Sequence, residues 1–157
     1  MAGLPASSLD DYSKFAVRLI LARFPDWEPF GIVQPNASGG YVDFRITCPS
    51  QAVEMGLWVS TADQELTVGF HTDHNHFTDY DNPFNPEPVV AGLDQAAAYL
   101  EDRCGVVSWY QGERLAGTIS AELPLSGPIP RMFKDYHVAR GTLRSWSGRL
   151  DRDEQSD

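Results

Sequence analysis

Residues 41–71 read YVDFRITCPSQAVEMGLWVSTADQELTVGFH. This stretch decides the fold because apolar and polar side chains alternate along it in three separate runs. The runs cover Tyr41 to Cys48, Val53 to Ser60 and Glu65 to His71. Alternation of this kind predicts β-strands that bury one face. Strands so close together along the chain are expected to pair as an antiparallel meander.

One helix is predicted before these strands and another after them. The first begins after Ser8, which can cap it, and ends before Pro25, because proline disfavours helical backbone in the residue that precedes it. The second has apolar side chains at helical spacing from Leu93 to Leu100 and ends near Gly105.

The remaining segments are predicted to be short strands, one long loop and a tail. Thr72 to Val90 shows no periodicity, and long loops without regular structure are often functional. The predicted strands in these segments are Phe30 to Val33, a hairpin of Val106 to Tyr110 with Arg114 to Leu123, and Tyr136 to Trp146.

These elements predict an α+β fold with a mostly antiparallel sheet of about six strands and two helices packed against it. A length of 157 residues suits one domain. We expect this domain to span residues 1–150 and residues 151–157 to form a frayed, charged tail.

The charge distribution is uneven. Ile46 to Asp102 contains no Lys or Arg, although the chain has a formal net charge of −10. This block carries the carboxylates Glu54, Asp63, Glu65, Asp73, Asp79, Asp81, Glu87, Asp94, Glu101 and Asp102. A field of one sign attracts a basic partner and repels nucleic acid, although surface carboxylates also keep proteins soluble.

Several other classes of protein are disfavoured. No signal peptide and no transmembrane helix are expected, so the cytoplasm is the expected compartment and no membrane partner is predicted. Two cysteines, Cys48 and Cys104, show no activating pattern, and the sequence leaves open whether they pair. No GxSxG elbow or phosphate-binding loop is present. The sequence predicts neither catalytic residues nor a cofactor.

The densest polar cluster is HTDHNH, residues 71–76. Imidazole and carboxylate bind zinc, iron and manganese, so His71, Asp73, His74 and His76 are candidate ligands of a metal-dependent enzyme. In a strand, however, alternation puts His71 with Asp73 on one face and His74 with His76 on the other. The spacing therefore separates the ligands, and the preferred interpretation has no metal site.

A recognition surface is the preferred interpretation of the same region. An outward Trp58 on a sheet face is a good interface anchor, because Trp, Tyr and Arg dominate binding hot spots. The residues predicted to bind a partner are Trp58, Glu65, Asp73, His74, His76, Asp79, Tyr80 and Asp81.

The stretches LWVS (57–60), ELTVGFH (65–71) and HNHF (74–77), followed by SWYQGER (108–114), resemble a segment of bacterial polymorphic-toxin immunity proteins. These proteins are the antidotes of contact-dependent inhibition and Rhs systems. The resemblance covers roughly residues 57 to 118. It implies a small cytoplasmic, non-enzymatic α+β protein that binds one toxin, and it assigns no contact residues.

The leading hypothesis is therefore an immunity protein whose acidic surface neutralises a basic toxin, such as a nuclease or another enzyme acting on nucleotides. The alternatives are a small metal-dependent enzyme that uses the His71–His76 cluster and an acidic adaptor domain. The sequence does not give the oligomeric state.

Overall fold

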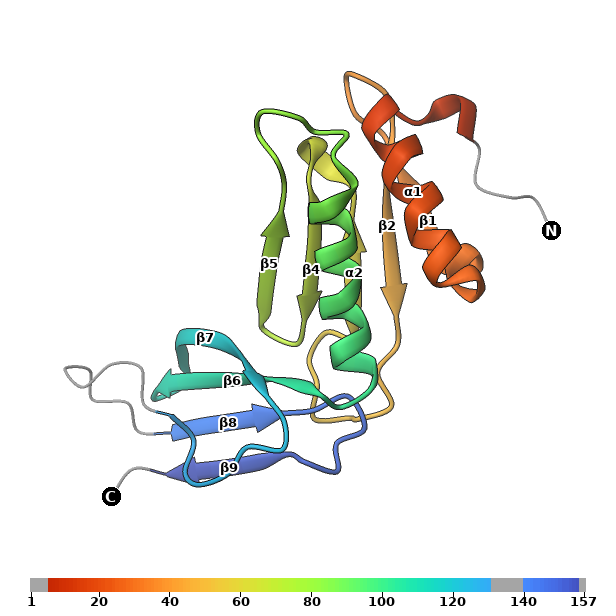
Figure 1. Cartoon of the computed structure of the whole chain (residues 1–157). Helices are drawn as coiled ribbons and strands as arrows, with labels where there is room; N and C mark the ends of the chain where they lie inside the picture. Colours follow the sequence, from red (N-terminus) through yellow and green to blue (C-terminus); the bar gives the residue numbers. More distant parts are fainter. Residues whose placement is uncertain (1–5, 131–139, 156–157) are drawn as a thin grey trace. The chain divides into compact units, whose positions relative to one another are not determined.

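A computed structural model of the chain describes residues 6–130 and 140–155 (Figure 1). Within these residues the fold is α+β, with two antiparallel sheets, two α-helices and three short 3-10 helices. The predicted fold class is therefore confirmed. The prediction of one sheet of about six strands is wrong in detail, because nine strands divide into sheets of five and four.

The chain forms two compact units. Unit 1 contains residues 1–47, 56–69 and 74–96, and unit 2 contains residues 48–55, 70–73 and 97–157. The chain crosses between the units several times, so neither unit is one continuous segment of sequence.

The five-stranded sheet follows the meander predicted from the alternating runs, except that the run predicted from Val53 to Ser60 is a strand only from Leu57. Its strand order is β1-β2-β3-β4-β5. The strands are β1 (Gly31–Gln34), β2 (Tyr41–Ile46), β3 (Leu57–Ser60), β4 (Leu66–Phe70) and β5 (Asp73–Phe77). The inward apolar positions of the central strands are buried, as alternation requires, except Ile46 at the end of β2, which is half-buried.

In unit 1, α1 (Asp11–Arg23) and the first part of α2 (Pro86–Leu100) lie against one face of this sheet (Figure 1). α2 approaches closely at Gly92, where a Cβ atom would lie 2.6 Å from Leu66 and 3.0 Å from Phe77. The short 3-10 helices are η1 (Ala6–Ser8), η2 (Pro25–Phe30) and η3 (Ala62–Gln64).

The start of α1 differs from the prediction. The N-cap is Asp10, whose Oδ1 accepts a hydrogen bond from the backbone N–H of Ser13 at 2.6 Å. Ser8 lies in η1 instead, and its carbonyl accepts a hydrogen bond from the backbone N–H of Gly40. The carboxylate of Asp10 therefore takes the capping role predicted for the Ser8 hydroxyl.

The four-stranded sheet of unit 2 has the order β7-β6-β8-β9. Its strands are β6 (Cys104–Gln111), β7 (Arg114–Glu122), β8 (Arg140–Arg144) and β9 (Arg152–Gln155). One face of this sheet is apolar and packs around Val107, Trp109, Ile129 and Leu143. The predicted β6–β7 hairpin is confirmed, and it turns at Gly112, where φ is +61°.

Three predicted segments need correction. Thr72 to Val90 is not one long loop, because it contains β5 and α2 begins at Pro86. The tail is not frayed throughout, because β9 pairs with β8 and the Arg144 guanidinium lies 2.7 Å from Asp153. Of the strand predicted from Tyr136 to Trp146, the structure shows β8, and positions 136–139 lie outside the described residues.

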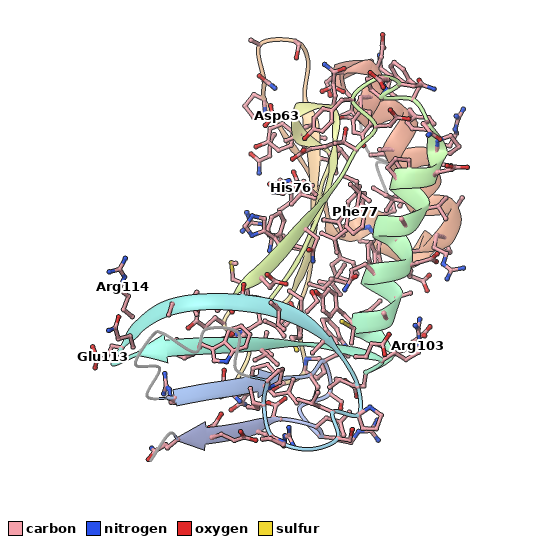
Figure 2. The ribbon with its side chains drawn as sticks, turned by 60° about the vertical axis from the view of Figure 1, so that its left-hand side comes forward. Asp63, His76, Phe77, Arg103, Glu113 and Arg114 are labelled. Atoms are coloured by element: carbon pink, nitrogen blue, oxygen red, sulfur yellow. The ribbon has the colours of Figure 1, made fainter. Side chains whose placement is uncertain are left out.

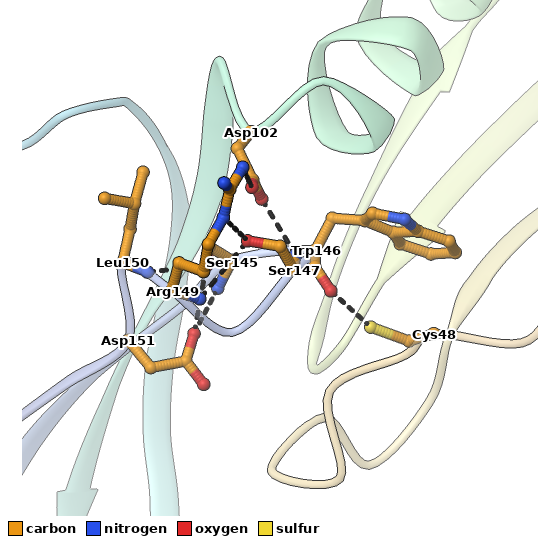
Figure 3. Close-up of polar contacts among 8 residues, drawn as sticks. All are labelled: Cys48, Asp102, Ser145, Trp146, Ser147, Arg149, Leu150 and Asp151. Atoms are coloured by element: carbon orange, nitrogen blue, oxygen red, sulfur yellow. Dashed lines mark hydrogen bonds and ion pairs between the residues drawn. The ribbon is translucent and has the colours of Figure 1, made fainter.

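In unit 2 a polar turn at residues 145–151 connects β8 to β9 (Figure 3). Asp151 Oδ1 accepts hydrogen bonds from the backbone N–H and hydroxyl of Ser145, and Asp102 Oδ1 accepts one from the N–H of Ser147. Burial alone would raise the pKa of Asp102, but the hydrogen bonds from Ser147 and the charge of Arg149 outweigh it and lower the pKa. These carboxylates hold the turn in place.

Both cysteines are free thiols. The Cys48 thiol donates a hydrogen bond to the carbonyl of Trp146 at 3.1 Å, and burial raises its pKa (Figure 3). Cys104 is buried. A thiol with a raised pKa is a poor nucleophile, which agrees with the lack of an activating sequence pattern around Cys48.

Candidate partner-binding surface

One face of the five-stranded sheet carries mainly polar and aromatic side chains in place of a packed apolar layer, and most of them, though not Thr67, are exposed or half-buried. Alternation along β5 separates the two faces, so that His76 lies on the side away from α2 and Phe77 on the side of α2 (Figure 2). Cross-strand pairing adds Arg45, which lies directly opposite Trp58. We call this surface the open face, and its residues are Ile32, Arg45, Trp58, Glu65, Thr67, His74 and His76.

The indole of Trp58 lies over Gly69 on the open face. A Cβ atom at position 69 would lie 2.2 Å from the indole, so only glycine leaves room for this ring. The indole is half-buried, and its ring centroid lies 6.1 Å from that of His74. Trp58 therefore lies on the open face, the arrangement in which it could serve as an anchor, and Gly69 explains how so large a side chain fits against the sheet.

A hydrogen-bonded group lies beside Trp58. Nδ1 of His76 lies 2.5 Å from Oε1 of Glu65, and the Thr67 hydroxyl donates to the same carboxylate at 3.2 Å. Thr67 Oγ1 also lies 3.1 Å from Nδ1 of His76. Three side chains from β4, β5 and the residue before β4 therefore hold one another in place.

β5 leads into a loop at residues 78–85, which we call the acidic loop. Asp79 fixes its shape, because its carboxylate accepts hydrogen bonds from the backbone N–H groups of Asp81 and Asn82 and from the Asn85 amide. The Asn85 hydrogen bond is the main cause of the lowered pKa of Asp79. Tyr80, in the first half of this loop, is 89% exposed.

The acidic loop and the first turns of α2 border a shallow depression with a volume of about 570 Å³. The residues that line it include three carboxylates and no Lys or Arg. The full lining is Thr78, Asp79, Tyr80, Asp81, Asn85, Glu87, Pro88 and Ala91. Asp81 and Glu87 make no ion pair within the described residues and are exposed. The depression is therefore negatively charged and open to solvent.

Asp73 has a different role from the other predicted contact residues. Its carboxylate accepts hydrogen bonds from Thr118 at 2.7 Å and from Ser120 at 2.9 Å, both within unit 2. Of the predicted contact residues, the open face contains Trp58, Glu65, His74 and His76. The acidic loop contains Asp79, Tyr80 and Asp81. Asp73 belongs to neither group, because its carboxylate is hydrogen-bonded within unit 2.

His71 is also turned inward. It is only 3% exposed, and its Nδ1 accepts a hydrogen bond from the backbone N–H of Glu54 at 3.1 Å. Burial is the largest cause of the lowered pKa of His71, and the charge of Arg144 adds to it. No group of three or more His, Cys, Asp or Glu side chains in the described parts of the chain could hold a metal ion. Of the four candidate ligands of the metal-enzyme hypothesis, His71 and Asp73 are engaged inside the molecule and only His74 and His76 lie next to each other.

The acidic block is divided by the fold. Asp94, Glu101 and Asp102 form ion pairs with Arg23, Arg103 and Arg149 respectively. Other carboxylates of the block, among them those of the depression, make no ion pair with arginine within the described residues. Arginines from outside the block therefore neutralise part of its charge, so the negative field is weaker there than the sequence alone indicates.

Sequence reasoning did not single out Ile32, Arg45 and Glu87. Ile32 is 50% exposed, and it joins the open face because β1 places it opposite Asp43. The alternation of β2 already assigned Arg45 to the polar face, but its position beside Trp58 depends on cross-strand register. Glu87 joins Asp81 only because α2 begins earlier than the sequence pattern predicted.

No protein-family model, curated protein or solved structure matches this chain. Among the described residues, no helix combines the length and apolar character needed to cross a membrane.

Proposed function

We propose that this chain is a cytoplasmic immunity protein that binds and neutralises a cognate bacterial toxin. The observation that carries the proposal is the open face, where an indole lies half-exposed on a rigid sheet beside an arginine. Trp and Arg are enriched among residues that dominate binding energy, and a ring held on a sheet loses little conformational freedom when it binds.

The acidic depression supports a basic partner. Three carboxylates and an exposed tyrosine provide both charge and a ring face for an incoming Lys or Arg side chain. A toxin that acts on nucleic acid or nucleotides must itself carry positive charge where it binds phosphate, and such a surface is complementary to this depression. The choice of a toxin as partner rests on the resemblance of residues 57 to 118 to immunity proteins.

The test begins with the polypeptide encoded by the neighbouring gene. We expect its expression alone to arrest bacterial growth, and co-expression of this chain to restore growth and yield a purified complex. Trp58→Ala is expected to weaken the affinity by a factor of about 30 or more, as for a hot-spot residue. Calorimetric titration measures this affinity.

Leu115→Ala is the matched control, because Leu115 is an exposed apolar residue on β7 of unit 2. Its affinity is expected to equal that of the wild type. Thermal melting of both variants checks that the fold is retained. A neighbouring product that is harmless and does not bind would favour the acidic adaptor, whereas equal affinity of Trp58→Ala and wild type would exclude the open face as the contact surface.

A further inference from the structure

Two histidines lie side by side on the open face. His74 and His76 are exposed, and they project from the same side of β5 because they are two positions apart. Their ring centroids are 5.1 Å apart, and the ring planes are nearly perpendicular, at 84°. Both rings are therefore held next to each other and within reach of solvent.

The hydrogen bond of His76 determines which ring nitrogen is available. An ionised carboxylate can only accept a hydrogen bond, so the contact with Glu65 places the proton of a neutral His76 ring on Nδ1. Nε2 then carries the lone pair. A carboxylate that holds the second nitrogen of a histidine is the usual support of a metal-binding imidazole, because it fixes the ring and increases its basicity.

The separation of the rings matches that of two ligands on one metal ion. Two imidazoles bound to a tetrahedral zinc ion at Zn–N distances of about 2.0–2.1 Å have ring centroids roughly 5 Å apart. The ring centroids of His74 and His76 are separated by 5.1 Å. Imidazole is a good ligand for zinc, copper and nickel, so these borderline divalent ions are the chemical class that the pair suits.

We propose that His74 and His76 form a surface site for one divalent transition-metal ion, with Glu65 as the supporting carboxylate of His76. Only these two side chains supply ligands, which agrees with the lack of a three-residue metal group in the described residues. The remaining coordination positions are open to water or to donor atoms of another molecule. The site does not depend on the proposed function, because it requires only the unbound chain.

The experiment is a calorimetric titration of the full chain with ZnCl₂ in a non-chelating buffer at neutral pH. We expect saturation at one equivalent. His74→Ala and His76→Ala should each weaken zinc binding at least about tenfold, and Glu65→Gln should weaken it about 10- to 100-fold, because it replaces the supporting carboxylate. The imidazole proton resonances of the two histidines should shift with zinc in the NMR spectrum of the wild type.

Two controls keep the result specific. Arg45→Ala alters the open face without removing a ligand, and His137→Ala removes a histidine outside the described residues; both should bind zinc as the wild type does. Circular dichroism without metal checks that each variant is folded. The proposal is overturned if the wild type shows no saturable binding, if the double variant His74→Ala/His76→Ala still binds one equivalent, or if binding is lost with His137 alone.

Discussion

At the scale of single residues, the sharpest feature of this molecule is a buried histidine in left-handed backbone. His71 has φ +55° and follows directly after β4. Its ring is buried and accepts a hydrogen bond from the backbone N–H of Glu54. An imidazole that accepts at Nδ1 must be neutral, so protonation removes this hydrogen bond and places a charge in the interior.

The free energy of unfolding is therefore expected to fall as the pH falls below about 6.5, the pKa of an unperturbed histidine. Burial lowers the pKa of His71 in the folded state, so the unfolded chain binds the proton more readily between the two pKa values. Stability is retained above the unfolded pKa and lost as the pH falls toward the folded pKa. One proton contributes a slope of at most about 1.4 kcal/mol per pH unit.

Urea denaturation of the wild type and His71→Asn between pH 5 and 7.5 measures this effect. Asparagine tolerates left-handed backbone and keeps an acceptor for the N–H of Glu54, but it does not titrate. The difference in unfolding free energy between the two proteins should therefore change with pH. A difference that stays constant across the range would contradict the role assigned to His71.

At the scale of elements, the sequence predicted the strands in which one face is apolar. β5 and β9 were missed for the same physical reason. Their sequences, DHNHF and RDEQ, carry polar side chains on both faces, so hydrophobic alternation gives almost no signal. Both strands lie at sheet edges and are held by pairing with a neighbour, which a local pattern does not report.

The cap of α1 gives a second prediction at this scale. Asp10→Ala should reduce the free energy of unfolding by about 1 kcal/mol, because the N–H of Ser13 loses its acceptor at the start of the helix. Asp11→Ala is the matched control, since the carboxylate of Asp11 pairs with the exposed side chain of Lys14 and is not the N-cap. Chemical denaturation compares the two, and a larger loss for Asp11→Ala would show that the cap has been misassigned.

At the scale of the whole molecule, the partition of strands into two sheets could not be read from the sequence. The order β7-β6-β8-β9 joins β6 to β8 across 28 residues of chain, from Gln111 to Arg140. Local patterns indicate that strands exist, but pairing over such a separation depends on packing. The same applies to the open face, whose members come from strands β1, β2, β3, β4 and β5 and from Glu65 just before β4.

Charge is the property of the whole molecule with the clearest functional consequence. The net charge of −10 creates a long-range field, whereas the carboxylates of the depression act locally. The two contributions can be separated with variants that change the net charge equally. Asp81→Lys/Glu87→Lys and Glu113→Lys/Glu122→Lys each replace two exposed carboxylates by two ammonium groups. Asp79 is left intact because it holds the acidic loop together.

If the partner meets the depression, the first variant should reduce the association rate constant about tenfold or more at low salt, whereas the second should reduce it much less. The difference should shrink as salt is added, because the Debye length falls from about 30 Å at 0.01 M to about 8 Å at 0.15 M. Stopped-flow measurement of complex formation supplies both rate constants. Equal rate constants for the two variants would mean that only the total charge matters, and the depression would then have no special part in recognition.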